Sequence, residues 1–251
     1  HINSDKIFKR IMKWPNFKNR IEYIIKSKEF LILKKLERKK RTYLKIDNYD
    51  PANRSGSDDS NKCTLILCEG LSAKTYAVTG LTQTLFGKSG RDWFGIYPLR
   101  GKLLNVRKAK ITKIAENKII SNLIKILNLS QSKDYTLEKN YKTLHYGRIL
   151  ILCDQDVDGI HISGLIQNFF HYLFPTLLKR SKHYITSMQT PIVKIAYINT
   201  KKEIAEKKGI TNFYNEEQYN NFISNKNINN LSTKYYKGLG TSSNKDIKLS
   251  F

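Results

Sequence analysis

Two short apolar runs along the chain predict buried β-strands. Cys63–Cys68 and Arg148–Cys153 are rich in Leu and Ile and lack the alternation of a half-exposed strand. The first run is followed by Glu69 and the second by Asp154. Ligands of open parallel sheets bind at the carboxyl ends of the strands, so these two carboxylates indicate a functional site at one sheet edge.

Helical patterns surround these strands, which predicts an α/β fold. After Gly159, apolar residues at spacings of three and four predict an amphipathic helix, which Pro175 bends or ends. Ser72 is expected to cap a helix that runs through Tyr76 to about Leu81. The pattern also predicts a basic helical region over 2–44, a loop over 47–62, helices over 111–129 and 214–223, and strands over 183–198 and 234–237.

Charge suggests a polyanionic partner. The 251 residues include 45 Lys and Arg against 21 Asp and Glu, a net charge of +24. Such a surplus favours nucleic acid, because each neutralised phosphate releases counterions. The alternative is a solvated basic surface, and the run Arg38–Arg41 is more often a solvated helix face than a DNA grip.

The cysteines and the lengths of the apolar runs limit which cellular compartment the protein is expected to occupy. Cys63, Cys68 and Cys153 fit neither a zinc motif nor a disulfide framework, so we expect buried free thiols in a reducing, intracellular compartment. No apolar run reaches the length of a membrane span, so no membrane partner is expected. The chain begins with His1, and we expect it to be a piece of a longer protein.

An acidic cluster carries the candidate chemistry. Asp154, Asp156 and Asp158 alternate with other residues and repel one another unless they are solvated or hold a cation. Mg²⁺ binds through one or two carboxylates plus substrate phosphate. A calcium loop is rejected because its twelfth position is Leu165 instead of Glu. A solvated acidic turn stays open, although Glu69 aims a further carboxylate at the same edge; in a basic protein the group suggests metal-assisted phosphodiester chemistry.

Four motifs in order resemble the TOPRIM region of type IIA DNA topoisomerases. Two of them, an Asp-x-Asp-x-Asp-Gly stretch and an acidic Glu-Gly motif, are shared with primases and some nucleases, whereas the other two are more specific to the topoisomerases. Details match the eukaryotic and large-DNA-virus branch, and the Lys-, Ile- and Asn-rich composition indicates an A·T-rich genome such as that of a virus or protist. The motifs are Glu69-Gly-Leu-Ser-Ala-Lys74, Pro98-Leu-Arg-Gly-Lys-Leu-Leu-Asn105, Asp154-Gln-Asp-Val-Asp-Gly159 and Lys234-Tyr-Tyr-Lys-Gly-Leu-Gly-Thr241.

The resemblance implies a Rossmann-like parallel sheet flanked by helices, with the TOPRIM domain over 61–251. Residues 1–60 would be a basic helical linker from the end of an ATPase and transducer region. In the family, the residues matching Glu69 and Asp154 hold the catalytic Mg²⁺, those matching Asp154 and Asp156 a second ion, and Asp158 completes the cluster; Mn²⁺ or Ca²⁺ can substitute.

The resemblance also assigns DNA contacts. Lys102 and Asn105 match positions that contact DNA near the cut, and Arg100 and Lys237 are expected to flank the same groove. The alternatives to DNA contact are that Arg100 is an ordinary surface arginine and that the chain after Lys237 forms an ordinary tight turn. The implied parent is a homodimer that binds double-stranded DNA, with ATP bound outside this chain. It would work in the nucleus of a eukaryote, or in the host cytoplasm if the source is a large DNA virus.

The sequence departs from the family pattern at two places. Leu71 stands where the family has Asp, beside the pocket used by topoisomerase poisons, so the metal ligands are kept and the poison response is expected to change. None of the 15 tyrosines matches the catalytic tyrosine, which in the family lies in a later winged-helix domain. We therefore expect the Mg²⁺-binding part of an ATP-dependent enzyme that passes one duplex through a break in another. The alternatives are a stand-alone TOPRIM nuclease or primase-like protein, and a non-catalytic DNA-binding module.

Overall fold

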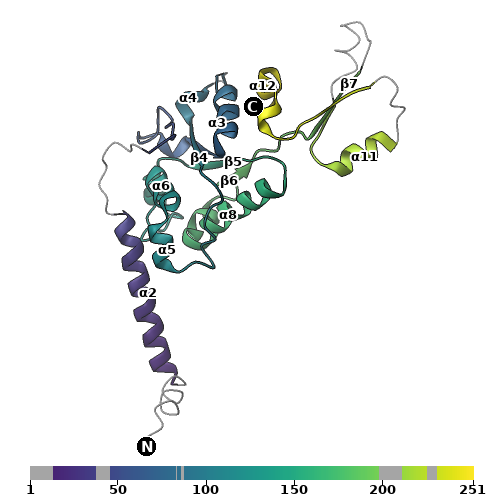
Figure 1. Cartoon of the computed structure of the whole chain (residues 1–251). Coiled ribbons are helices and arrows are strands. Elements are labelled where there is room, and N and C mark those ends of the chain that lie inside the picture. The colour runs from purple at the N-terminus through teal and green to yellow at the C-terminus, as the bar shows by residue number, and fades with distance from the viewer. Residues whose placement is uncertain (1–13, 38–45, 83, 86–87, 198–210, 225–230) are drawn as a thin grey trace, which may run out of the picture.

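A parallel four-stranded sheet forms the centre of the structure, a computed structural model that describes residues 14–37, 46–82, 84–85, 88–197, 211–224 and 231–251. The strand order is β4-β1-β5-β6 (Figure 1). This confirms the predicted α/β class and the two predicted buried strands. The strands are β1 (Thr64–Glu69), β4 (Phe94–Leu99), β5 (Arg148–Leu152) and β6 (Ile185–Ser187).

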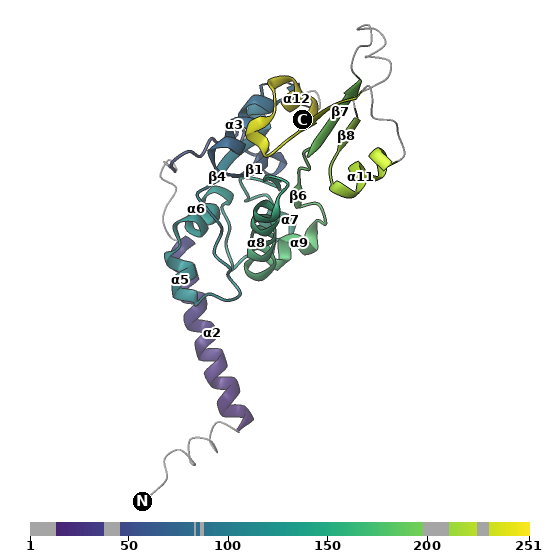
Figure 2. The ribbon, with the colours of Figure 1, turned by 45° about the vertical axis from the view of Figure 1, so that its right-hand side comes forward.

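Helices cover both faces of this sheet (Figures 1 and 2). Alternate residues of β1 face opposite layers: Leu65 and Leu67 belong to one apolar core, whereas Ile66 and Cys68 belong to another. The larger core includes α6 and α8, and the smaller one includes α3 and α12. Burial on both faces explains why the strands are apolar throughout. The helices flanking the sheet are α3 (Gly70–Gly80), α4 (Gly90–Trp93), α5 (Ile111–Glu116), α6 (Lys118–Leu127), α7 (Glu138–Tyr141), α8 (Val157–Leu173), α9 (Pro175–Arg180) and α12 (Asn244–Ser250).

Three predicted helix boundaries were wrong. Helix α3 begins at Gly70, directly after β1, so Ser72 lies inside the helix and does not cap it. The expected single helix over 111–129 is two, because Asn117 ends α5 and its Oδ1 caps α6 by accepting from Ile120 N at 3.0 Å. Helix α8 begins at Val157 and includes Gly159, because the side chain of Asp156 supplies its N-cap.

A second, antiparallel sheet extends from the first (Figure 2), and its strand order is β8-β7-β9. Its strands are β7 (Val193–Tyr197), β8 (Thr211–Phe213) and β9 (Leu231–Tyr235), and α11 (Glu216–Ser224) packs on it. The strands expected over 183–198 are β6 and β7, and the helix expected over 214–223 is α11, which begins two residues later. The strand expected over 234–237 is β9, which ends two residues earlier. A short hairpin, β2 (Thr84–Leu85) and β3 (Lys88–Ser89), and two 3₁₀ turns, η1 (Ser60–Lys62) and η2 (Leu239–Thr241), complete the described elements.

The basic N-terminal region contains one long helix, α2 (Pro15–Glu37), which projects from the domain in Figure 1. The helical positions predicted within 1–13 and the basic run over 38–41 lie outside the described residues. Tyr23 and Ile25 on α2 are 72% and 50% exposed, so α2 leaves apolar surface uncovered. Among the helices described, none is long and apolar enough to cross a membrane.

Candidate metal and DNA site

Parallel pairing brings the two predicted strand ends to one edge of the sheet. Cys68 of β1 lies opposite Leu152 of β5, so Glu69 and Asp154 follow at neighbouring positions. The backbone N–H of Asp154 donates a hydrogen bond to the Glu69 carboxylate. Helices α3 and α8 begin at the same edge, and their N-termini favour negative charge there. The fold therefore places both carboxylates where open α/β sheets bind ligands.

The Asp154 carboxylate is held by the chain that follows β9. Its Oδ1 accepts a hydrogen bond from Leu239 N at 2.8 Å. A Cβ on Gly238 would lie 2.8 Å from Asp154 Oδ2, so only glycine allows this approach. Lys237 is exposed and lines the same small pocket as Asp154 and Asp156. Asp154 and Leu239, which are 85 residues apart in the sequence, thus form one wall of the site.

The other two aspartates have partners of different kinds. Asp156 Oδ1 accepts from Gly159 N at 2.8 Å and caps α8. Asp158 pairs with Lys102 Nζ at 2.7 Å. The hydrogen bond from Lys102, and then its charge, lower the pKa of Asp158, so this carboxylate stays ionised. One basic residue of the predicted DNA-contact motif therefore already touches the acidic cluster.

Glu69 is the least satisfied carboxylate of the cluster. Its Oε2 is buried and has no hydrogen-bond partner among the described residues. Burial raises the pKa of Glu69, and the negative charges of Asp154 and Asp156 raise it further. A divalent cation would give this oxygen a partner and neutralise the repulsion. The donor set therefore fits a hard, oxygen-binding ion such as Mg²⁺.

The carboxylates of the acidic cluster, as described, do not converge on one point. Nowhere in the described ranges do three Asp, Glu, His or Cys side chains form a group close enough to hold an ion. This spacing arises because Asp156 accepts a hydrogen bond at the N-terminus of α8 and Asp158 forms an ion pair with Lys102. Since Mg²⁺ commonly takes only one or two carboxylates and completes its shell with water and phosphate, the arrangement still suits it.

Comparison with known proteins identifies the domain. Residues 64–188 match the Toprim domain model, and residues 188–251 match the model of the C-terminal associated domain of TOPRIM. The chain is 40% identical over 260 residues to DNA topoisomerase 2 of Invertebrate iridescent virus 6 and 43% identical over 244 residues to DNA topoisomerase 2-alpha of Mus musculus. The chain belongs to the TOPRIM region of the type II DNA topoisomerases.

The similarity extends over nearly all of the chain but over only part of each relative. The alignments cover 97% and 96% of this chain, but 22% of the viral protein and 14% of the mouse protein. A crystal structure of the Plasmodium falciparum topoisomerase II DNA-binding, cleavage and re-ligation domain superposes with a TM-score of 0.70 at 38% identity. The match covers 84% of this chain and 26% of that one.

The remaining predicted contact residues of this TOPRIM region lie on the loop after β4. Arg100 and Lys102 are exposed. Asn105 is partly buried, and its Oδ1 accepts from Arg107 N and from Asn168 Nδ2, both at 3.2 Å. These bonds hold the loop against α8. Because Asn105 Oδ1 already accepts two hydrogen bonds, the side chain can bind a further group only by donating from Nδ2.

Exposed apolar residues border the acidic cluster of the TOPRIM region. Leu71 on the first turn of α3 is 62% exposed, and Val157 and Ile160 on the first turn of α8 are 83% and 70% exposed. Sequence reasoning singled out Leu71 alone. The other two could have been found from their positions, since Val157 lies between Asp156 and Asp158, and Ile160 directly follows Gly159 at the end of that stretch.

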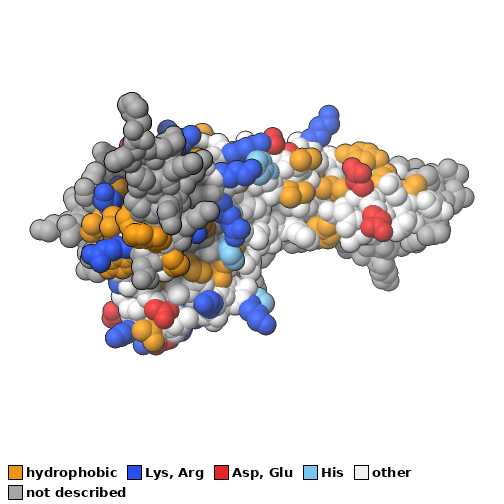
Figure 3. All heavy atoms as spheres, turned by 90° about the horizontal axis from the view of Figure 1, so that it is seen from below, with side chains coloured by type: hydrophobic (Ala, Val, Ile, Leu, Met, Phe, Trp, Pro, Cys, Tyr) orange, Lys and Arg blue, Asp and Glu red, His pale blue; other side chains and the backbone are white. Residues whose placement is uncertain are grey.

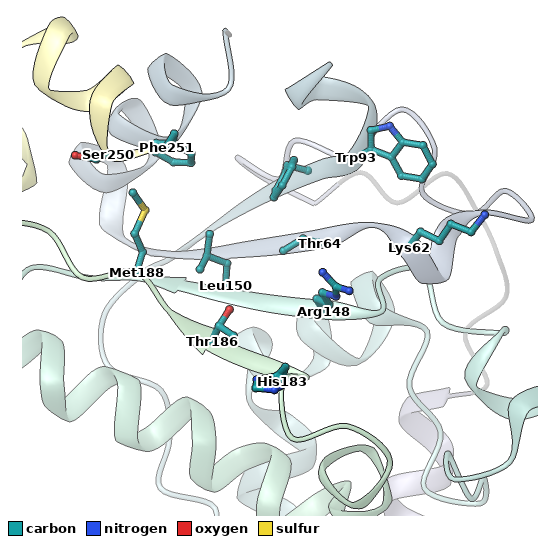
Figure 4. A pocket seen from close by; sticks show the side chains of 11 residues that line it. Lys62, Thr64, Trp93, Arg148, Leu150, His183, Thr186, Met188, Ser250 and Phe251 are labelled. Atoms are coloured by element: carbon teal, nitrogen blue, oxygen red, sulfur yellow. The ribbon is translucent and has the colours of Figure 1, made fainter. Parts of the chain in front are cut away.

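A large pocket lies away from the acidic cluster. It encloses 770 Å³ on the face of the sheet near α12, with Lys62 and Trp93 at one end and Phe251 at the other (Figure 4). It is also lined by Thr64 and Arg148, which begin β1 and β5, and no Asp or Glu lines it. The pocket thus borders the amino ends of the strands, whereas the carboxylates lie at the carboxyl ends.

Proposed function

We propose that the chain is the Mg²⁺-binding TOPRIM part of an ATP-dependent type II DNA topoisomerase, which passes one duplex through a transient break in another. The observation that carries this proposal is the buried, unpaired Oε2 of Glu69 beside Asp154 and Asp156, at the sheet edge where parallel folds bind ligands. The similarity to DNA topoisomerase 2 supports the same conclusion.

Glu69, Asp154 and Asp156 would hold the ion, with Asp158 beside them; a second ion, or Mn²⁺ or Ca²⁺, can be accommodated by the same oxygens. When bound, the ion supplies electrostatic stabilisation of charge that develops on phosphodiester oxygens. Lys102 and Arg100 would bind DNA phosphates, Asn105 would donate from its free amide, and Lys237 would contact DNA from the opposite wall.

The attacking tyrosine would come from another part of the parent enzyme, in a homodimer that binds ATP outside this chain. Residues 1–60 would then link TOPRIM to the ATPase and transducer region, and the enzyme would act in the nucleus or, for a large DNA virus, in the host cytoplasm. The chain alone is expected not to cleave DNA.

Cleavage in trans tests this proposal. The chain is mixed with supercoiled plasmid, Mg²⁺ and the tyrosine-bearing winged-helix fragment of a type II relative. Covalent protein–DNA product is expected only when both polypeptides are present. Cutting or primer synthesis by the chain alone would instead establish the stand-alone nuclease or primase alternative.

Mg²⁺ titration separates the proposed enzyme from a non-catalytic DNA-binding module. Asn at position 156 can still cap α8, because Asn and Asp are equally good N-cap residues, but it lacks the charge that holds Mg²⁺. Calorimetry with duplex DNA present should therefore show Mg²⁺ binding by the parent chain and at least about 10-fold weaker binding by Asp156→Asn at an unchanged melting temperature. Absence of Mg²⁺ binding by the parent chain contradicts the proposal.

Poison sensitivity is expected to depend on position 71. Leu71→Asp adds an exposed carboxylate beside the cluster and leaves Glu69 and Asp154 in place, so cleavage in trans should be retained. Its response to a topoisomerase poison should change, because an exposed apolar contact becomes a charge. Dose–response curves of poison-induced cleavage measure this, and equal curves for Leu71→Asp and the parent chain would show the idea to be wrong.

A further inference from the structure

A further pocket, formed by α8, α9, the loop after β4 and the start of β6, is lined by basic residues and by no acidic residue. It encloses 430 Å³. Three of its side chains, Arg107, His171 and Lys182, are cations or can become cations. Polar groups that can donate hydrogen bonds surround them, and neither Asp nor Glu is among the lining residues. The other lining residues are Gln167, Asn168, Leu178, Ser181 and Ile185.

The donors of this basic pocket are oriented and available. Arg107 Nη2 lies 2.9 Å from His171 Nδ1, and because a guanidinium can only donate, Nδ1 is the acceptor. The imidazole therefore keeps its proton on Nε2, which can donate to an anion. Arg107, His171 and Lys182 are exposed, and no ion pair of the described residues includes any of the three.

The loop after β4 links the basic pocket to the acidic cluster. The loop after β4 contacts α8 at three successive levels: Lys102 with Asp158, Asn105 with Asn168, and Arg107 with His171. Residues 158 and 171 are thirteen positions apart, about 20 Å along a helix that rises 1.5 Å per residue. At 3.4 Å per nucleotide, this distance corresponds to about six steps of B-DNA. Seen from below, Lys, Arg and His side chains form a row across the underside of the domain (Figure 3).

We infer that the basic pocket of Arg107, His171 and Lys182 binds backbone phosphates of duplex DNA, about six nucleotides from the phosphate at the acidic cluster. The inference rests on the proposed function, since it extends the DNA path of that site. Phosphate oxygens are the ligands that a guanidinium, an imidazole N–H and an ammonium group share. Phosphate contacts carry no sequence information, so we expect these three side chains to add affinity without sequence preference.

Salt-dependent DNA binding tests the inference. In the double variant Arg107→Gln with Lys182→Gln, the slope of log K against log salt, measured by fluorescence anisotropy on a 30-base-pair duplex, should fall by about 2. The duplex should bind at least about tenfold more weakly at 0.1 M salt. The matched control, Arg91→Gln with Lys245→Gln, removes the same charge from exposed sites outside the pocket. It should change affinity about threefold or less.

Further variants separate binding from folding and from catalysis. Arg107→Lys with Lys182→Arg keeps both charges and should restore DNA binding, and melting temperatures identify any variant that is misfolded. Cleavage in trans should be unchanged in the control variant Arg91→Gln with Lys245→Gln. A failure of cleavage in the parent chain contradicts the proposed function alone, because the salt slopes are measured without cleavage. Equal salt slopes for the pocket variant and its control overturn the inference. The inference is also overturned if the glutamine variant loses binding of inorganic phosphate, measured by calorimetry, but still binds the duplex as tightly as the parent chain does.

Discussion

Replacing Glu69 with Gln is expected to abolish cleavage in trans while leaving the fold at least as stable. Glu69 is partly buried, its Oε2 has no hydrogen-bond partner among the described residues, and burial, followed by the charges of Asp154 and Asp156, raises its pKa. These features make an ionised Glu69 unfavourable in the folded chain without a cation. Gln removes the charge and keeps the size, so the metal-free protein is relieved of repulsion while the proposed Mg²⁺ site loses a ligand.

The expected loss of cleavage is at least about 100-fold, the usual scale for removing one electrostatic contact in a transition state. The melting temperature without Mg²⁺ should equal or exceed that of the parent chain, and the rise produced by added Mg²⁺ should disappear. Glu116→Gln is the matched control, because Glu116 is exposed on α5, away from the acidic cluster. Full cleavage by Glu69→Gln would show that Glu69 is not a metal ligand.

The acidic edge could be predicted because its physical causes are local. A strand buried on both faces must be apolar throughout, so β1 and β5 were visible in the sequence, and so were the carboxylates that follow them. Strand β4 was not predicted. It contains Gly95, where a Cβ would lie 2.2 Å from the hydroxyl of Tyr146, and Pro98, which the ladder tolerates because β4 is an edge strand. Both residues disfavour a strand when only the sequence is considered.

The connections within the site could not be predicted, because they depend on tertiary placement. Nothing near Asp158 in the sequence indicates that Lys102 will pair with it, and nothing near Asp154 indicates that Leu239 N will donate to it. The cap formed by Asp156 was a missed local signal, because an Asp three residues before Gly159 has the spacing of an N-cap bond. The metal-ligand roles of the carboxylates stay predictions until Mg²⁺ binding is measured.

Asp246→Asn is expected to cause the largest loss of stability, because Asp246 joins the second sheet to α12. Its side chain is 13% exposed and pairs with Lys194 of β7 at 2.5 Å and with Lys234 of β9 at 3.2 Å. It also completes the capping box of α12 with Ser243. Removing one partner of such a buried pair leaves Lys194 uncompensated, and we expect a loss of about 3 kcal/mol in the free energy of unfolding.

The effect of Asp246 should depend on pH in a defined direction. Burial alone would raise the pKa of Asp246, but hydrogen bonds from Lys194 and Ser243 outweigh it and lower the pKa below the usual 3.8. A carboxyl group whose pKa is lower in the folded than in the unfolded chain stabilises above its unfolded pKa and loses that effect as the pH falls through its folded pKa. Urea unfolding should thus show the full difference between Asp246→Asn and the parent chain at about pH 6, and a smaller one at about pH 3.

Asp59→Asn provides the control for the Asp246 experiment. Asp59 also pairs with two basic residues, Lys62 at 2.6 Å and Arg54 at 3.3 Å, but both partners are about half exposed or more, where solvent screens the attraction. Its urea midpoint should stay close to that of the parent chain. Equal midpoints for Asp246→Asn and Asp59→Asn would mean that the ion pairs do not hold the second sheet to α12. The apolar contacts of Ile247 and Phe251 with the sheet and α3 would then have to hold α12 in place.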